Sequence, residues 1–471
     1  MKAPVEFHDL DDLAPGWVWK PLQDLCDDPR QDIVDGPFGS NLKASEYVDE
    51  GTPIARLQNV SRNQFLDKSI RCVTIEKARE LSRHSFSVGD ILLTKLGDPL
   101  GKACIVPTAI GSGVIVADLV RIRPSVRLVD KRYLTYAINS PAVIRNFERH
   151  TKGTTRPRVN LNVVRQLPIP VAPREHQGNV VAEIEKQFSR LDEAVANLQR
   201  VKANLKRFTS SILSDAVEGR LVVTEADLAR DEGRALEHAS EALRCTLAAR
   251  SAKRNGRDKY REPIAPIGDL AALPNGWCWS TVDQLAEVGT GATPNRSKAV
   301  YFEGGNVPWV TSSVVNAPYV DQASEFVTPI ALEQTNLTLY PPGTLLVAMY
   351  GEGKTRGKCA ELRISAATNQ ALAALQVNAA ARPYLKLFLQ HNYEATRKVA
   401  SGGVQPNLNL SLVRAIKVPL PPLAEQRRIV AEVDRRLSIV REVEAEVDAN
   451  LKRAQALRQA VLQAAFACKL A

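Results

Sequence analysis

The chain has 471 residues, of which 44% are hydrophobic, and a formal net charge of +10. This length exceeds one ordinary domain, and the excess of lysine and arginine favours an anionic partner, of which nucleic acid is the usual one. The N-terminal stretch lacks the pattern of a secretory signal and the sequence has no apolar run of about 18 residues, so we expect a cytoplasmic protein without a membrane span. Seven scattered cysteines without a Cys-x-x-Cys pair predict neither disulfides nor a zinc site.

Residues 1–172 predict a first globular domain of mixed α/β type. Short apolar runs bounded by glycine or proline, such as "GDILLTKLG" from Gly89, are typical of strands. The stretch "DKRYLTYAINSPAVIRNFERH" from Asp130 predicts one helix beside the sheet.

Residues 173–221 predict a long helix. Its apolar positions alternate in steps of three and four up to Leu198, which is the pattern of a coiled-coil seam, and we expect the seam to continue through Val201, Leu205, Phe208 and Ile212. About 40 helical residues span roughly 60 Å, which outruns a small domain. Packing on its own globular domain is the weaker alternative, and we expect the helix to pair with another one.

Residues 222–272 predict a connector. Its first half favours helix, whereas Arg250–Arg261 is basic and polar, and Pro263 and Pro266 end any helix. We expect this connector to be mobile, with a solvated run of charge.

The rest of the chain repeats the first half. The stretch "GTTRPRVNLNVVRQLPIPVAPREHQ" starts at Gly153 and "GGVQPNLNLSLVRAIKVPLPPLAEQ" starts at Gly402, 249 residues later. The domain starts also match, as "LAPGWVW" from Leu13 and "LPNGWCW" from Leu273. We therefore predict a second globular domain over 273–421 and a second long helix over 422–471, whose seam includes Val430, Val433, Val440 and Leu457. The two helices are each other's obvious partners, in an antiparallel coiled coil.

Two catalytic motifs compete with a non-catalytic interpretation. The stretch "AMYGEGKT" (Ala348–Thr355) fits a loose phosphate-binding loop, and "EGK" with Asp321 upstream resembles a metal-dependent nuclease. The equivalent segment of the first half, "LTKLGDPLGKACIV", lacks both signatures, and a strand–loop–strand explains both copies. The alternative function is thus a P-loop or metal-dependent nuclease or NTPase with a coiled-coil arm.

The two-copy layout resembles the specificity subunit of type I restriction–modification enzymes over nearly the whole chain. The resemblance rests on both domain starts, on "GPFGSNLK" (Gly36–Lys43), on "GTGATP" (Gly289–Pro294) and on "QPNLNLSLVRAIKVPLPPLAEQRRIVAEVD" with the terminal "LQAAFACKL". The first copy departs from it slightly, because Arg158 stands where the second copy has Asn407.

The resemblance implies an α+β protein with two target recognition domains, each followed by a long helix. Each domain would read one half of a bipartite, asymmetric site on double-stranded DNA, and the coiled coil would set the spacing. The resemblance also implies two methyltransferase subunits and restriction subunits as partners, with roles in DNA methylation and phage defence. S-adenosylmethionine, ATP and Mg would belong to those partners, and this chain would bind no metal or cofactor and carry no catalytic residue.

Loops rich in glycine, lysine and arginine are the candidate DNA contacts, because backbone N–H groups and cations bind phosphate and side chains such as Arg and Gln suit base edges. In the first copy these residues are Gly36, Gly39, Ser40, Asn41, Lys43, Lys95, Lys102, Thr154, Thr155, Arg156 and Arg158. In the second copy they are Thr290, Gly291, Thr293, Tyr350, Lys354, Arg356, Lys358, Gly403 and Gln405. The recurring tryptophans Trp17, Trp19, Trp277 and Trp279 could stack on a flipped base, but we expect them to pack in the cores.

Overall fold

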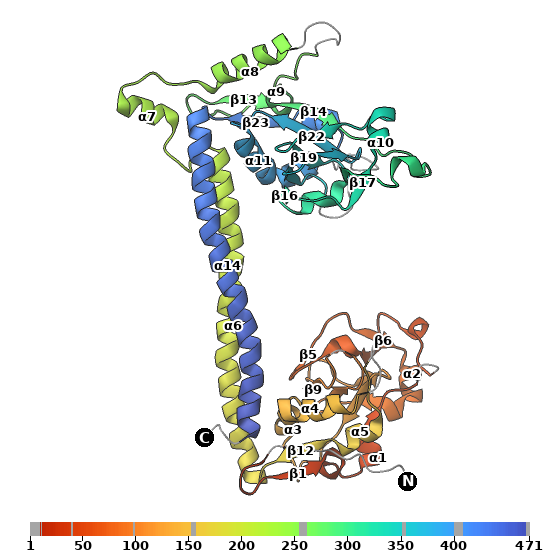
Figure 1. The fold of residues 1–471 in the computed structure, drawn as a ribbon. Coiled ribbons are helices and arrows are strands. Elements are labelled where there is room, and N and C mark those ends of the chain that lie inside the picture. Colours follow the sequence, from red (N-terminus) through yellow and green to blue (C-terminus); the bar gives the residue numbers. More distant parts are fainter. Residues whose placement is uncertain are drawn as a thin grey trace. The chain divides into compact units, whose positions relative to one another are not determined.

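The computed structural model describes residues 10, 12–38, 41–97, 99–151, 157–253, 261–350, 355–399 and 408–467. The chain divides into two compact units (Figure 1). The first unit combines Met1–Arg200 with Val447–Ala471, and the second unit is Val201–Glu446. Each unit contains one globular part together with segments of both long helices.

Two four-stranded sheets form the globular part of the first unit. The first sheet is antiparallel throughout and has the order β2 (Ile33–Asp35), β11 (Leu119–Ile122), β8 (Ile91–Thr94), β9 (Ala103–Ile105). The second sheet has a central parallel pair and the order β6 (Arg71–Val73), β3 (Thr52–Ala55), β10 (Gly113–Ile115), β7 (Ser85–Phe86).

The second unit repeats both sheets with the same strand order and directions. Its first sheet runs β14 (Ala286–Thr290), β22 (Leu372–Val377), β19 (Leu345–Ala348), β20 (Cys359–Leu362), with β16 (Tyr319–Val320) added at one edge. Its second sheet runs β17 (Glu325–Val327), β15 (Val307–Val310), β21 (Ala366–Thr368), β18 (Leu339–Tyr340). The predicted duplication of one α+β fold is confirmed.

In each globular part, a tyrosine holds one of two equivalent helices to a short strand pair. In the first unit Tyr133 of α3 (Lys131–Ile138) donates its hydroxyl to Pro170 O at 2.9 Å, beside the pair β1 (Val18–Pro21) and β12 (Pro168–Val171). In the second unit Tyr384 of α11 (Arg382–His391) donates to Pro419 O at 2.7 Å, beside β13 (Cys278–Thr281) and β23 (Lys417–Leu420). The same polar contact therefore fixes both copies.

The single helix predicted from Asp130 is two helices. A second helix, α4 (Pro141–Arg149), follows α3 and begins with Pro141. A proline has no N–H to continue the first helix, but it suits the first position of a new one. The equivalent pair in the second unit is α11 and α12 (Tyr393–Val399).

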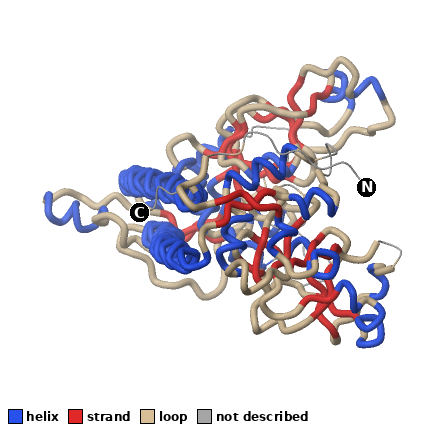
Figure 2. The backbone as a smooth tube through the Cα atoms, turned by 90° about the horizontal axis from the view of Figure 1, so that it is seen from below, coloured by secondary structure: helices blue, strands red, loops and turns tan. Residues whose placement is uncertain are grey.

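The two long helices of the chain pair with each other, and each unit contains a part of both. Figure 2 shows them nearly end-on and side by side. They are α6 (Arg174–Val217) and α14 (Leu423–Phe466). In the first unit Val181 and Ile184 near the start of α6 share a core with Leu462 near the end of α14. In the second unit Ile212 near the end of α6 shares a core with Ile429 near the start of α14. The predicted antiparallel pairing is confirmed, and no helix in the described ranges has the length and apolar content to cross a membrane.

Part of the predicted seam is wrong. Val201, Phe208 and Leu457 are 41%, 50% and 51% exposed, and Ile429, rather than the neighbouring Val430, is fully buried. A straight helix drifts by about 20° per heptad from a strict seven-residue stripe. A stripe that is extended from sequence alone therefore leaves the interface after several turns.

The helical character predicted for the first half of the connector is confirmed. The connector forms α7 (Glu225–Glu232) and α8 (Ala239–Lys253). The buried carboxylate of Glu225 lies 2.6 Å from the Arg234 guanidinium and 2.8 Å from that of Arg428. Arg250 donates to Asp283 O at 2.8 Å. Buried ion pairs are costly to break, so these contacts hold the connector on the second unit.

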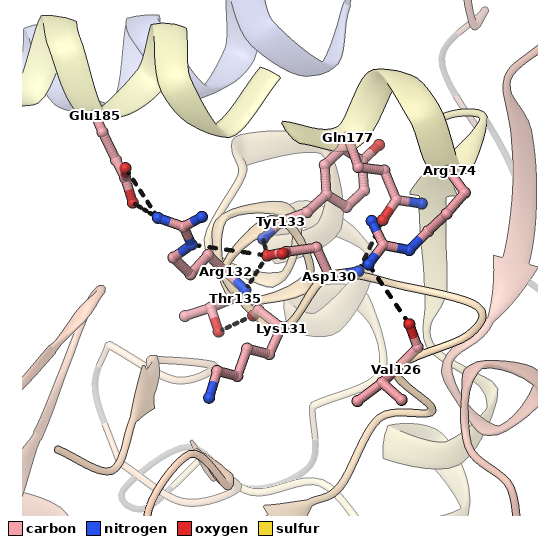
Figure 3. A network of polar contacts seen from close by, with 9 residues as sticks. All are labelled: Val126, Asp130, Lys131, Arg132, Tyr133, Thr135, Arg174, Gln177 and Glu185. Carbon is pink, nitrogen blue, oxygen red and sulfur yellow. Dashed lines mark hydrogen bonds and ion pairs between the residues drawn. The ribbon is translucent and has the colours of Figure 1, made fainter. Parts of the chain in front are cut away.

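A polar network joins α6 to the globular part of the first unit (Figure 3). Asp130 caps α3 through the backbone N–H groups of Arg132 and Tyr133, and its own N–H donates to Gln177 Oε1 at 2.8 Å. Gln177 Nε2 donates to Ala172 O at 3.0 Å, and Arg132 pairs with Glu185 at 3.2 Å. In the second unit the equivalent Gln426 donates to Pro421 O at 2.8 Å. A buried glutamine thus fixes the start of each long helix.

We predict that Gln177→Ala lowers the free energy of unfolding by about 1–3 kcal/mol, because the substitution leaves the half-buried N–H of Asp130 and the buried carbonyl of Ala172 without this partner. Urea unfolding measures the change, and Ser189→Ala, at an exposed site of α6, is the matched control. Equal midpoints for the two variants would contradict a fixing role for Gln177.

Candidate nucleic-acid interface

In each unit, loops that follow different strands of the first sheet lie together at one edge of that sheet. In the first unit β2 and β8 both run antiparallel to β11, so they are parallel to each other and their C-terminal ends meet at the same edge. Lys95, which follows β8, places Nζ 2.5 Å from Oδ2 of Asp35 at the end of β2. The structure therefore brings the loop after β2 and the loop after β8 together.

A third predicted segment joins this edge. Gly97 N donates to Pro157 O at 3.1 Å, and Val159 N donates to Lys95 O at 3.0 Å. Arg158 between them is exposed and bridges Leu96. The candidate residues Lys95 and Arg158, which lie far apart in the sequence, thus occupy one continuous edge.

The second unit builds the same edge with different side chains. Met349, after β19, accepts a hydrogen bond from Leu408 N at 3.0 Å, which is the equivalent of the Val159–Lys95 contact. Thr290, at the end of β14, donates through Oγ1 to Leu372 O at 2.8 Å. Tyr350, which follows Met349, is exposed.

Polar side chains hold two further candidates of this second edge. Thr293 donates through Oγ1 to Gln370 Oε1 at 2.6 Å, and Lys358 Nζ donates to Asn316 Oδ1 at 2.9 Å. The side chain of Arg356 is half-buried. Gln370 and Asn316 were not predictable from the sequence, because each is more than 40 residues from its partner and only the folded sheet brings them together.

Several candidates stand outside these contacts or outside the described residues. Asn41 and Lys43 follow β2 in the sequence and are exposed. The backbone N–H of Lys43 donates to Glu46 Oε2 at 2.6 Å. Lys102 pairs through its backbone with Thr94 at the start of the return strand β9. Eight candidates lie outside the described residues, namely Gly39, Ser40, Thr154, Thr155, Arg156, Lys354, Gly403 and Gln405.

The glycines at the two edges have a role in the fold. A Cβ at Gly36 would lie 2.0 Å from Val116 O, and a Cβ at Gly291 would lie 1.6 Å from Thr368 O, so only glycine fits either place. Gly36 N also donates to Leu119 O at 3.1 Å. This N–H group is therefore already bonded within the sheet, and a contact of Gly36 with DNA stays a prediction.

Two buried cysteines occupy equivalent strands of the first sheets. Burial raises the pKa of the thiols of Cys104 and Cys359, on the equivalent strands β9 and β20, to about 12. Both thiols therefore stay protonated at neutral pH. Burial also raises the pKa of Tyr340, whose hydroxyl donates to Thr290 O at 3.0 Å and positions that residue at the edge.

The segment that resembles a phosphate-binding loop has a different topology. A phosphate-binding loop leads from a strand into a helix whose N-terminus faces the anion. Here the loop after β19 leads into β20, which pairs antiparallel with β19. The predicted strand–loop–strand is confirmed, and Asp321, the suggested metal ligand, pairs with Arg363 at 3.2 Å.

Three of the four recurring tryptophans pack in the cores, as predicted. Trp17 and Trp19 pack against the core of the first unit, and Trp277 is buried in that of the second. Trp279 is half-buried and donates to Ala271 O at 2.9 Å. These contacts favour a packing role over base stacking.

Comparisons with known proteins agree with this duplicated architecture. Residues 274–449 match the family of type I restriction modification DNA specificity domains. The type I restriction enzyme EcoR124I/EcoR124II specificity subunit of Escherichia coli is 21% identical over 33% of this chain and 40% of its own length. The MjaIX specificity subunit of Methanocaldococcus jannaschii is 24% identical over 34% and 38%. The chain thus spans about two fifths of these two curated relatives.

Longer matches come from another relative and from solved structures. The type I restriction enzyme EcoDI specificity subunit of Escherichia coli is 21% identical over 69% of this chain and 67% of its own length. A chain from a structural study of type I R-M system assembly covers 97% of this chain and 99% of itself, with a TM-score of 0.65 and 17% identity. The HsdS subunit from Thermoanaerobacter tengcongensis covers 98% and 99%, with a TM-score of 0.53 and 19% identity. The two structures share the fold of this chain.

We predict that Gly291→Ala lowers the free energy of unfolding by about 1–3 kcal/mol, because the added methyl group overlaps the carbonyl of Thr368 and the edge must open. Thermal unfolding measures the loss. Gly178→Ala, in α6 with open space around it, is the control and should be neutral or slightly stabilising. A Gly291→Ala protein as stable as the parent would refute the close approach.

Proposed function

We propose that the chain is a specificity subunit of a type I restriction–modification enzyme and that each of its globular parts reads one half of a bipartite, asymmetric DNA target. In this proposal the two globular parts are target recognition domains, and the edge loops of the first sheet of each unit face the duplex. The chain itself carries no chemistry. It selects the site on which other subunits act.

The observation that carries this proposal is one sheet edge built twice with different polar side chains. The first edge offers Arg158 and the Lys95–Asp35 pair, whereas the second offers Tyr350, the Thr293–Gln370 pair and Lys358. Arg and Lys suit guanine edges, and Gln suits adenine. Two similar frames with unlike side chains would read two unlike half-sites.

The paired helices support a spacing role. Repeats joined through antiparallel helices acquire a pseudo-twofold relation, which matches the near-twofold symmetry of duplex DNA. Two readers on one face of a duplex need a separation of about one helical turn, roughly 34 Å. We propose that α6 and α14 set this separation.

Partners supply the remaining chemistry in this proposal. Two methyltransferase subunits and the restriction subunits dock on the chain, and S-adenosylmethionine, ATP and Mg bind to those partners. The competing function, a P-loop or metal-dependent nuclease or NTPase, has less support because the loop after β19 continues into a strand.

We predict that replacing Lys354, Arg356 and Lys358 together by alanine weakens DNA binding by the assembled complex. The logarithm of the binding constant falls as log salt rises, and each lost phosphate contact reduces the steepness of this fall by about 0.9. Loss of all three contacts therefore reduces the steepness by up to roughly 3. Binding titrations at several salt concentrations measure this slope.

The control is a triple alanine variant at Lys206, Arg207 and Arg441, which are exposed on the paired helices rather than on the edge loops. It removes the same charge and should leave the slope nearly unchanged. If the loop variant keeps the parental slope, the assignment of this loop to DNA is wrong.

We predict that one heptad inserted after Val195 in α6, with a matched heptad in the facing part of α14, lengthens the preferred spacer by roughly 3 base pairs. Seven helical residues add about 10.5 Å, and whole heptads preserve the apolar seam. Selection from DNA with randomised spacers measures the preference. The half-site sequences should stay the same, and an unchanged spacer would rule out a spacing role for the helices.

A further inference from the structure

A short turn that connects the two sheets lies at the loop edge of each unit, and none of the DNA contacts predicted from the sequence falls on it. In the second unit this edge turn is Asn369–Ala371, between β21 and β22. Its first N–H donates to Val310 O at 3.1 Å, and its last carbonyl accepts from Met349 N at 2.8 Å. The edge turn is therefore tied to the end of β15 and to the loop after β19, with Gln370 at its centre.

The first unit has the same edge turn with a different central side chain. Here the edge turn is Val116–Asp118, between β10 and β11. Its first N–H donates to Ala55 O at 3.2 Å, and its last carbonyl accepts from Lys95 N at 2.9 Å. The main-chain frame is thus shared by the two units, whereas Ala117 stands in the place of Gln370.

A second position beside the edge turn differs in the same sense. Gln370 is exposed, and its Oε1 accepts a hydrogen bond from Thr293 Oγ1 at 2.6 Å. Thr293 stands two residues after the close-packed Gly291. In the first unit Phe38 stands two residues after the equivalent Gly36 and is 76% exposed. The second unit therefore has a hydrogen-bonded pair where the first unit has two apolar side chains.

The contact with Thr293 determines how the amide of Gln370 is presented. An amide oxygen has two lone pairs and an amide nitrogen has two N–H groups, so Oε1 can accept once more and Nε2 can donate. Within the described ranges no residue accepts a hydrogen bond from this Nε2. Because Thr293 already orders the long side chain, a ligand that binds the amide has less rotational freedom to remove. The pair thus holds a donor and an acceptor side by side at an exposed turn.

A donor next to an acceptor matches one base edge in the major groove of DNA. Adenine presents the acceptor N7 beside the N6 amino donor, and a glutamine amide pairs with both. Guanine presents two acceptors, N7 and O6, so Oε1 would face a second acceptor with no hydrogen between them. The amide of Gln370 therefore suits adenine, whereas the methyl group of Ala117 can form no hydrogen bond with a base.

We propose that Gln370 specifies one adenine in the half-site read by the second unit and that Thr293 positions its amide. This inference rests on the proposed function and deepens it, because it assigns a base to a residue outside the loops predicted from the sequence. A glutamine that only supported Thr293, or only contacted a phosphate, would carry no base preference. The base preference is therefore the property to measure.

The test is selection of bound sequences by the assembled complex from DNA that is randomised in both half-sites. The parent should prefer adenine at one position of one half-site by about 5- to 150-fold. Gln370→Ala should lose the preference at that position and keep the others. Gln370→Glu still offers Thr293 an acceptor but no longer donates, so it should prefer cytosine, whose N4 amino group donates to a carboxylate.

Variants of Thr293 and of a remote glutamine serve as controls. Thr293→Val removes the hydroxyl that orders the amide, so the adenine preference should fall by about two- to tenfold without changing to another base. Thr293→Ser keeps the hydroxyl and should retain the preference. Gln322→Glu makes the same chemical change as Gln370→Glu at an exposed position and should alter no preference. Gln322 follows β16, which runs parallel to β20 and away from the edge, so it lies at the opposite end of the sheet.

The proposal is overturned if both Gln370 variants keep the parental preference at every position, or if they weaken binding to all sequences equally. Retained selection of the other half-site shows that each variant is folded and assembled. If the parent selects no bipartite sequence, the proposed function itself fails. If the parent selects one and both Gln370 variants select the same one, only the assignment of Gln370 to adenine fails.

Discussion

Burial of the apolar stripes of α6 and α14 against each other is the interaction on which the rest of this protein depends. Each helix has 44 residues, far more than one globular part can cover, and an isolated helix with an exposed stripe would be unstable in water. Because the stripes pair in antiparallel fashion, the end of each helix enters the core that surrounds the start of the other. Phe466, for example, packs against Trp17 and Tyr133 of the first unit. The pairing thereby links the last residues of the chain to its first domain.

Polar side chains then fix each globular part onto its helix. Tyr133 and Tyr384 donate hydrogen bonds to equivalent proline carbonyls in the two copies. Gln177 and Gln426 donate to a second pair of equivalent carbonyls. Such buried contacts are directional, so they define how a sheet is oriented on its helix, whereas apolar packing alone would tolerate rotation. In the proposed function this orientation would determine which loops face DNA.

Much of this fold could be predicted from the sequence, because the duplication makes each structural pattern occur twice in the chain. The domain starts, the long helices and their pairing followed from the repeat at an interval of 249 residues. The candidate edges were predicted in part, since the loop after β8 meets the segment around Arg158 and the loop after β19 meets the equivalent segment at Leu408. The Lys95–Asp35 and Thr293–Gln370 contacts were not predictable, because they join residues that are 60 and 77 positions apart. The attachment of the connector was not predictable, because its ion-pair partner Arg428 lies in the other half of the chain.

The loops at each edge are tied to one another largely by main-chain hydrogen bonds, such as those of Gly97 with Pro157 and of Leu408 with Met349. A peptide group offers the same donor and acceptor whatever side chain it carries. Substitutions along these loops therefore change the displayed chemistry without dismantling the support beneath it. Such an arrangement leaves the surface free to diverge under selection while the glycines at Gly36 and Gly291 stay constrained by close packing.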